Sequence, residues 1–183
     1  RLNKGVKVMA MVKAFAYGSG SAEVASLLQF HKADYLAVAY ADEGVELRKA
    51  GISLPIMVMN VDDAAFETII QHKLEPELFS FSILKCLQFF LERQALPQYP
   101  VHIKLDTGMH RLGFEAKDIP ELSIFLQQNR HMAVISVFSH LAASEDPAED
   151  AFTKQQAAVY EYCCLQLKQA LGYSFIMHLS NSA

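Results

Sequence analysis

Short apolar runs alternate along the whole chain with segments in which apolar residues recur every three or four positions. The first pattern predicts buried strands and the second predicts amphipathic helices. Strands are expected at residues 6–12, 35–39, 56–59, 74–79, 101–105, 133–139 and 175–179. Helices are expected at residues 22–30, 42–50, 62–72, 82–94, 119–128 and 149–171. Ser21 is expected as the N-cap of the first helix, and Gly51 and Gly172 are expected to end the second and the last.

The regular alternation of strands and helices predicts a parallel sheet with helices outside it. Seven such strands fit a (β/α)₈ TIM-type barrel that lacks its last strand, because a complete barrel takes about 250 residues. An open doubly wound sheet is the alternative, but no G-x-G-x-x-G motif follows a strand in this sequence. The expected fold class is therefore α/β, a truncated TIM-type barrel with about seven of its eight strands.

Composition narrows the class of protein further. The chain has 183 residues, of which 52% are hydrophobic, so it can bury a sizeable core. Its net charge of -4 gives no reason to expect nucleic acid, and no apolar run is long enough to cross a membrane. The spacing of the three cysteines fits neither a disulfide framework nor a zinc site, so we expect no bound metal. Reduced thiols are typical of a cytoplasmic enzyme, which is the expected location. Both ends look cut, which predicts a fragment of a longer protein.

Candidate chemistry begins at the end of the first strand, with Lys13. Gly18 and Gly20 follow it and lead into the first helix. A glycine-rich entry to a helix N-terminus binds phosphate well, because free backbone N–H groups point outward there. An amine beside such a site indicates an aldehyde cofactor that carries a phosphate. Taken alone, a lysine at a strand end is more often only a surface charge.

The strand at 101–105 carries unusual polar residues. His102, Lys104 and Asp106 alternate with apolar residues and would face the interior of a closed barrel. Burying a charged amine is costly unless it is paired or chemically altered, so Lys104 requires a functional explanation. The alternative is a solvent-facing strand with ordinary alternation.

Two histidines near the ends of later strands also occupy inward-facing positions of the strand alternation. His140 and His178 share a face with the inward positions of the sixth and seventh strands. A lone histidine is more often structural, but active sites of these barrels lie at the carboxyl ends of the strands. Four titratable side chains are therefore expected at one rim: Lys13, Lys104, His140 and His178. Acidic pairs at 42–43 and 62–63 are explained by the dipoles of the helices that they open.

Four stretches resemble the signatures of the alanine racemases, pyridoxal-phosphate enzymes of fold type III. They are KAFAYGSG at 13–20, HIKLDTGMHRLGF at 102–114, SHLA at 139–142 and HLSNSA at 178–183. Phe15 and Ser19 replace the asparagine and histidine that are common in the first signature, whereas Lys13 and Tyr17 match it. The resemblance covers essentially the whole chain. The chain is similar to the racemase half of bifunctional bacterial proteins, in which this half follows a muramoyl-peptide ligase.

The resemblance implies a set of cofactor-binding residues. They are Lys13, Tyr17, Arg111, His140, Asn181 and Ser182. Lys13 would hold pyridoxal phosphate covalently and act as one of two acid/base groups, and Tyr17 and Ser182 would bind the phosphate. Arg111 would reach both the phenolic oxygen of the cofactor and the carboxylate of the substrate, and His140 would pack against the ring.

Two further lysine and histidine positions take supporting roles in the same resemblance. Lys104 matches a lysine that is carbamylated in many members of the family. A carbamate would turn a buried cation into an anion able to hold Arg111. His178 would act behind the residues that touch the cofactor.

The implied activity is the interconversion of L-alanine and D-alanine for peptidoglycan synthesis. The family's second acid/base group is a tyrosine of a C-terminal β domain, donated by the partner subunit of a homodimer. That domain would lie beyond residue 183, so residues 1–183 are expected to be a partial pyridoxal-phosphate-binding barrel domain. By itself this fragment should racemise alanine poorly or not at all.

Three other functions remain open on the sequence. One is a barrel that binds pyridoxal phosphate without turnover. The second is a decarboxylase of the same fold, acting on diaminopimelate or a basic amino acid. The third is a barrel in which the lysines are only structural.

Overall fold

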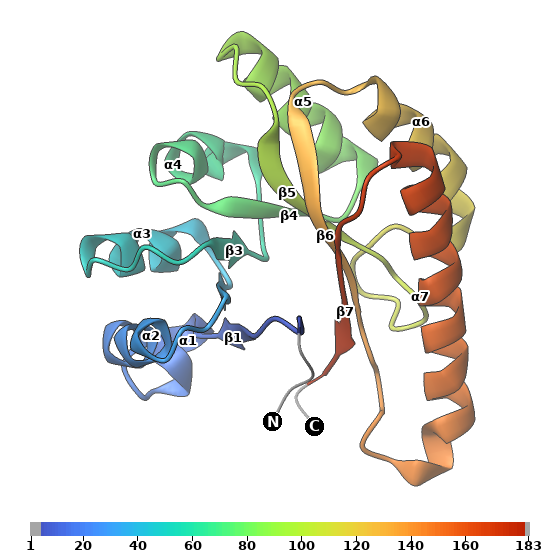
Figure 1. Ribbon diagram of the computed structural model, residues 1–183, viewed down its shortest axis with the longest axis horizontal. Helices are drawn as coiled ribbons and strands as arrows, with labels where there is room; N and C mark the ends of the chain where they lie inside the picture. Colours follow the sequence, from blue (N-terminus) through green and yellow to red (C-terminus); the bar gives the residue numbers. More distant parts are fainter. Residues whose placement is uncertain (1–4, 182–183) are drawn as a thin grey trace. The chain divides into compact units, whose positions relative to one another are not determined.

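A computed structural model of the protein describes residues 5–181, and the chain forms two compact units, residues 1–77 and 78–183 (Figure 1). Parallel strands alternate with helices in both units. The described residues contain seven strands, each paired in sequence order with its neighbours inside its unit. This is the pattern of a (β/α)₈ barrel with seven of its eight strands, so the predicted fold class is confirmed.

The first unit is a parallel sheet with its helices on one side (Figure 1). Its strands are β1 (Met9–Met11), β2 (Tyr35–Val38), β3 (Ile56–Val58) and β4 (Glu75–Leu78). The connecting elements are α1 (Lys13–Tyr17), α2 (Ser21–Phe30), α3 (Ala41–Lys49), the 3₁₀ turn η1 (Asp63–Ala65) and α4 (Phe66–Gln71). Met9 pairs with Tyr35, and Leu36 pairs with Ile56.

The core of the first unit lies between the strands and the helices. All three residues of β3 are buried, which is expected for a parallel strand covered on both faces. The largest apolar side chains that α3 and α4 bury are those of Leu47, Phe66 and Ile69. The Arg48 guanidinium donates hydrogen bonds to four backbone carbonyls after α3 and α4, which ties these loops together.

The second unit contains three parallel strands and three long helices. The strands are β5 (Tyr99–Lys104), β6 (Met132–His140) and β7 (Ile176–Ser180). The helices are α5 (Phe81–Arg93), α6 (Ile119–Gln128) and α7 (Asp150–Leu171), with 3₁₀ turns η2 (Ala116–Asp118) and η3 (Pro147–Glu149) before the last two. Helix α7 runs beside α6 and packs on β6 and β7 (Figure 1).

Two helical stripes build the core of this unit. The apolar stripe of α5, Leu84, Leu87 and Leu91, is fully buried. The buried stripe of α7 has helical spacing but mixed chemistry: Gln156, Tyr160, Cys163, Cys164 and Leu167. Burial raises the pKa of both thiols on this stripe, and all three cysteines of the chain are free.

The sequence located every strand but misplaced several ends. The first strand is confined to Met9–Met11. Val6 and Val8 before it are exposed, although the Val8 carbonyl accepts from the Tyr35 amide at 3.0 Å. The helix expected at 62–72 begins as the 3₁₀ turn η1, where the Asp62 side chain accepts a hydrogen bond from the Ala65 amide at 3.0 Å.

The predicted helix caps had mixed outcomes. Ser21 is the first residue of α2 and not its N-cap, because its hydroxyl donates to the Val12 carbonyl at 3.3 Å. Helix α3 ends at an Ala50 cap, one residue before the predicted Gly51. Gly172 caps α7 in the left-handed conformation, as predicted. The short element α1 was not predicted.

Candidate functional site

Lys13 opens a left-handed turn directly after β1. Ala14, Phe15, Ala16 and Tyr17 have φ angles of 52°, 55°, 49° and 53°. Each L-residue in this region costs roughly 1–2 kcal/mol, so four in succession persist only where the surroundings hold them. Backbone hydrogen bonds close the turn: the amide of Ala16 donates to Val12 at 3.1 Å, and the amide of Gly20 donates to Phe15 at 3.0 Å.

Glu43 on α3 supplies the side chain that fixes this turn to the sheet. One carboxylate oxygen accepts from the amide of Ala14 at 2.7 Å. The other accepts from the amides of Ala39 and Tyr40 at 2.6 and 3.1 Å. A single carboxylate therefore holds the carboxyl ends of both β1 and β2. The helix dipole, the expected reason for an acidic residue here, does not by itself account for these contacts of Glu43. Its position three residues after the helix N-cap is the spacing of a capping box, which was a signal for the backbone contact.

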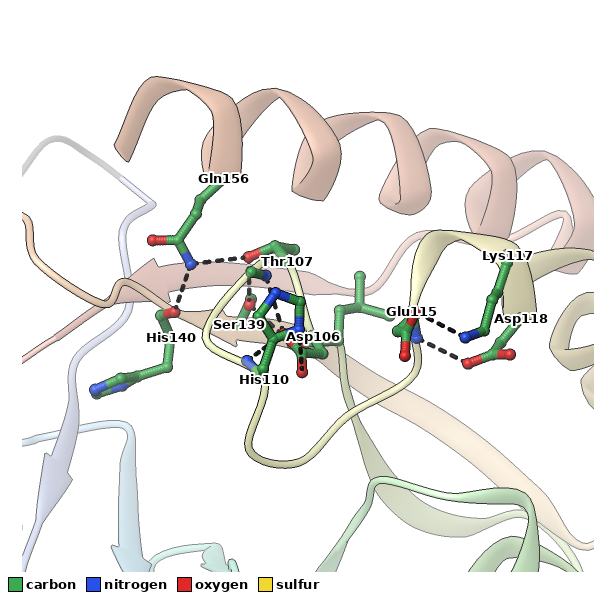
Figure 2. Close-up of polar contacts among 11 residues, drawn as sticks. Asp106, Thr107, His110, Glu115, Lys117, Asp118, Ser139, His140 and Gln156 are labelled. Carbon is green, nitrogen blue, oxygen red and sulfur yellow. Dashed lines mark hydrogen bonds and ion pairs between the residues drawn. The ribbon is translucent and has the colours of Figure 1, made fainter. Parts of the chain in front are cut away.

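The second unit places Arg111 on a closed loop after β5. The loop returns to its strand through the Leu105–Phe114 bridge, and the amide of Phe114 donates to the Lys104 carbonyl at 2.9 Å. Inside the loop, the Asp106 carboxylate accepts from two backbone amides, those of residues 108 and 110 (Figure 2). The guanidinium of Arg111 is left on the exposed side of a firmly anchored loop.

Lys104 is buried, as the alternation of β5 predicted for an inward face. Its side chain is 4% exposed, and its ammonium lies 5.4 Å from the centre of the Phe138 ring. His178 stacks on Phe138 with 4.7 Å between ring centres and 4° between planes. The three residues lie in register across β5, β6 and β7. Both faces of β5 are buried, so the alternative of a solvent-facing strand is wrong.

A second buried row joins two histidines through a hydroxyl. Ser136 Oγ lies 2.7 Å from His102 Nδ1 and 3.2 Å from His178 Nε2. One hydroxyl donates only one hydrogen, so at most one of the two histidines can accept from Ser136 and at least one must donate to it. Burial, and then the nearby His102, lowers the pKa of His178 to about 4. The lowered pKa of His178 therefore favours its neutral imidazole near pH 7.

The depressed pKa of His178 makes stability depend on pH. The unfolded chain binds a proton at His178 below about pH 6.5, whereas the folded protein binds one only below about pH 4. The free energy of unfolding should therefore increase as the pH is raised from about 4 to about 6.5. Lowering the pH from 7 to 4.5 should therefore remove about 2 kcal/mol of the free energy of unfolding through this group. Urea unfolding followed by circular dichroism at both pH values measures it.

His178→Gln supplies the matched comparison, because an amide can bond to Ser136 but cannot titrate in this range. The variant should lose less stability than the unaltered protein on acidification. His31→Gln changes an exposed histidine and should keep the full pH dependence. Equal pH dependence in the unaltered protein and His178→Gln would contradict the assignment.

The remaining predicted residues lie at the ends of β6 and β7. His140 is half-buried and pairs in register with Ser180. Asn181 follows β7 and donates from its amide to Glu145 at 2.9 Å. Ser182 lies outside the described residues. Tyr17, at the end of the left-handed turn, is 66% exposed.

The predicted site residues divide between the two units. Lys13 and Tyr17 share the turn of the first unit. The second unit holds the rest and brings two groups of them together: Lys104 with His178 around Phe138, and His140 beside the strand end that leads to Asn181. Residues 5–181 contain no group of three or more potential metal-ligating His, Cys, Asp or Glu side chains. Within the same residues, no helix is long and apolar enough to span a membrane.

Comparison with known proteins gives one consistent family. The sequence model of the alanine racemase N-terminal domain matches residues 1–183. The alanine racemase of Symbiobacterium thermophilum is 36% identical, and the aligned region covers 100% of this chain and 48% of that protein. That of Clostridium tetani is 34% identical, covering 98% of this chain and 46% of the relative. The chain thus spans about half the length of the curated relatives that it matches.

Solved structures agree with the sequence relatives. An alanine racemase from Clostridium difficile 630 superimposes with a TM-score of 0.90 at 34% identity, covering 99% of this chain and 47% of its own. The structure from Bartonella henselae, which holds covalently bound pyridoxal phosphate, gives a TM-score of 0.83 at 26% identity, with 98% and 51% covered. The chain belongs to the alanine racemase family and corresponds to its N-terminal domain.

Proposed function

We propose that residues 1–183 form the cofactor-binding barrel domain of a pyridoxal-phosphate-dependent enzyme that interconverts L-alanine and D-alanine. One observation carries the proposal. Lys13 opens the turn at the carboxyl end of β1 in a chain that matches the alanine racemase N-terminal domain along its whole length. Carboxyl ends of strands are where barrels of this kind hold their catalytic groups.

The donor groups of the chain suit pyridoxal phosphate. A lysine amine can bond to the aldehyde of the cofactor. The exposed hydroxyl of Tyr17 and the Ser182 hydroxyl would bind its phosphate, with Asn181 alongside. The exposed guanidinium of Arg111 provides a rigid fork of donors for a phenolate or a carboxylate, and the His140 imidazole provides a flat face for the ring.

The chain's own residues then divide the work of racemisation. When bound, pyridoxal phosphate supplies an electron sink that acidifies the α-hydrogen of the amino acid. Lys13 removes or delivers that proton at one face, through its neutral amine or its ammonium. Arg111 would hold the substrate carboxylate. Inversion needs a second acid/base group on the opposite face, which we assign to the part of the enzyme beyond these residues.

Lys104 is proposed to carry a carbamate, formed when its neutral amine adds carbon dioxide and releases a proton. The product is an anion, which would hold the guanidinium of Arg111 on the next loop. The buried position of Lys104 supports this role, because a charged amine is costly to bury unless it is paired or chemically altered. The mass of the intact protein would show the added group. We assign His178, stacked on Phe138, to the layer behind the cofactor.

The wider setting follows from the same proposal. The full-length enzyme would be a homodimer in which the partner contributes the second acid/base group. D-alanine would serve peptidoglycan synthesis, and the free cysteines fit a cytoplasmic location.

The test compares two proteins in the presence of pyridoxal phosphate and L-alanine. One contains residues 1–183 and extends to the full length of the curated relatives, and the other is residues 1–183 alone. The longer protein should form D-alanine, measured by chiral chromatography. The shorter one should be slower by about a hundredfold or more, because one of the two acid/base groups is missing.

Other outcomes identify the competing functions. Cofactor binding by the longer protein without D-alanine formation would indicate a non-catalytic carrier. Release of carbon dioxide from diaminopimelate or lysine would indicate a decarboxylase. Absence of cofactor binding would leave Lys13 as a structural residue. Rapid racemisation by residues 1–183 alone would contradict the assignment of the second group to another part of the enzyme.

A further inference from the structure

A buried glutamine on α7 touches the carboxyl ends of two neighbouring strands. Gln156 has no solvent exposure. Its side-chain oxygen accepts a hydrogen bond from the Ala142 amide at 3.0 Å. Its nitrogen donates to the His140 carbonyl at 3.2 Å and to the Thr107 hydroxyl at 3.4 Å (Figure 2). One side chain therefore joins the segment after β5 to the segment that ends β6.

The hydrogen bonds around Gln156 run in a single direction. The Ala142 amide can only donate, so it fixes the orientation of the Gln156 amide and turns both N–H groups toward the other two partners. Ser139 Oγ donates its only hydrogen to the Leu105 carbonyl at 2.8 Å. Thr107 must then donate to Ser139, 2.9 Å away, and accept from Gln156. With these directions, each hydrogen bond between α7 and the end of β5 has one donor and one acceptor.

Both ends of this network support residues of the proposed site. Thr107 opens the loop that carries Arg111, and the next residue, Gly108, packs against α7. A Cβ atom at Gly108 would lie only 3.1 Å from the Phe152 ring. At the other end, Gln156 holds the main chain of His140, whose imidazole points away from the network (Figure 2).

We propose that Gln156 is a positioning residue that sets the Arg111 loop and His140 relative to each other for cofactor binding. This role rests on the proposed function. The physical reason is the cost of burial. Both N–H groups of the buried amide are used, so any shift of either segment would leave a buried polar group unpaired. The two segments therefore move together or not at all.

Gln156→Glu tests the proposal with little change of shape. The variant keeps the acceptor for Ala142 and loses both donors. In the full-length enzyme, we expect pyridoxal phosphate to dissociate about tenfold more readily and the KM for alanine to rise. Gln155→Glu makes the same change at an exposed neighbouring position, and it should match the unaltered protein in both readouts.

Thr107 variants keep the test decisive where Gln156→Glu fails to fold. Thr107→Val removes the second link and should weaken cofactor binding, whereas Thr107→Ser keeps the hydroxyl and should preserve it. In the double variant with Gln156→Glu, the loss should be smaller than the sum of the single losses, because both substitutions break one network. Tight cofactor binding by folded Gln156→Glu, or equal behaviour of Thr107→Val and Thr107→Ser, would overturn the proposal.

Amide hydrogen exchange separates this proposal from the proposed function. Gln156→Glu should speed exchange at both 105–114 and 140–142, without any cofactor. If the unaltered protein binds no pyridoxal phosphate, the proposed function fails, and exchange alone then decides whether Gln156 couples the two segments. Faster exchange confined to one segment would overturn the coupling.

Discussion

Lys13→Ala should abolish the visible absorbance of lysine-bound pyridoxal phosphate and slow racemisation by about a thousandfold or more. The substitution removes both the covalent attachment of the cofactor and one of two acid/base groups, and general acid/base catalysis alone contributes about 10²–10⁴-fold. Absorbance of the purified full-length enzyme, before and after borohydride, measures the attachment. Chiral analysis of alanine measures the rate.

Lys7→Ala is the matched control for this loss. Lys7 lies just before β1 and is exposed, so its removal should leave the absorbance and the rate unchanged. Circular dichroism should show that both variants fold. Racemisation by Lys13→Ala at the rate of the unaltered enzyme would refute the role of Lys13 as cofactor anchor and acid/base group.

Gly113→Ala should be the most damaging small substitution in the second unit. Gly113 has a φ of 135°, and a Cβ atom there would lie 2.5 Å from the backbone nitrogen of Asp106 and 2.6 Å from the carbonyl carbon of Leu105. Backbone atoms cannot yield as a flexible side chain would, so the loop must open. We expect a loss of roughly 3 kcal/mol or more in the free energy of unfolding, which corresponds to a fall of about 6–12 °C in Tm.

The position of Gly113 also ties this stability loss to function. The strand end that Gly113 abuts closes the loop that carries Arg111, so cofactor affinity should fall together with Tm. Gly172→Ala is the control, because Gly172 also has a positive φ, 71°, but nothing lies within 4 Å of its added Cβ. It should cost only about 1–2 kcal/mol and leave cofactor affinity intact. Similar losses for the two variants would show that backbone conformation, not the contact, decides the effect.

Elements were predictable where hydrophobic burial alone specifies them. Leu84, Leu87 and Leu91 recur at helical spacing and are buried, and the seven apolar runs all contain strands. The ends were less accurate because single hydrogen bonds decide them. The Ser21 hydroxyl, for example, donates to the Val12 carbonyl just after β1 and not to its own helix.

The polar framework of the site was harder to predict, because its partners are distant in sequence. Glu43 bonds to Ala14, 29 positions away, and Gln156 bonds to Thr107, 49 positions away. A signal for Gln156 does exist: it occupies the spacing of the buried stripe that continues through Tyr160 and Leu167. A polar residue on such a stripe indicates a buried hydrogen-bonding role.

The left-handed turn at 14–17 has a consequence for the order in which the enzyme would be assembled. No local preference of these L-residues favours positive φ, so the turn exists only once β1, β2 and Glu43 are in place. In a nascent or unfolded chain, Lys13 has the same surroundings as any other lysine. Under the proposed function, selective capture of pyridoxal phosphate by this amine would therefore follow folding of the first unit.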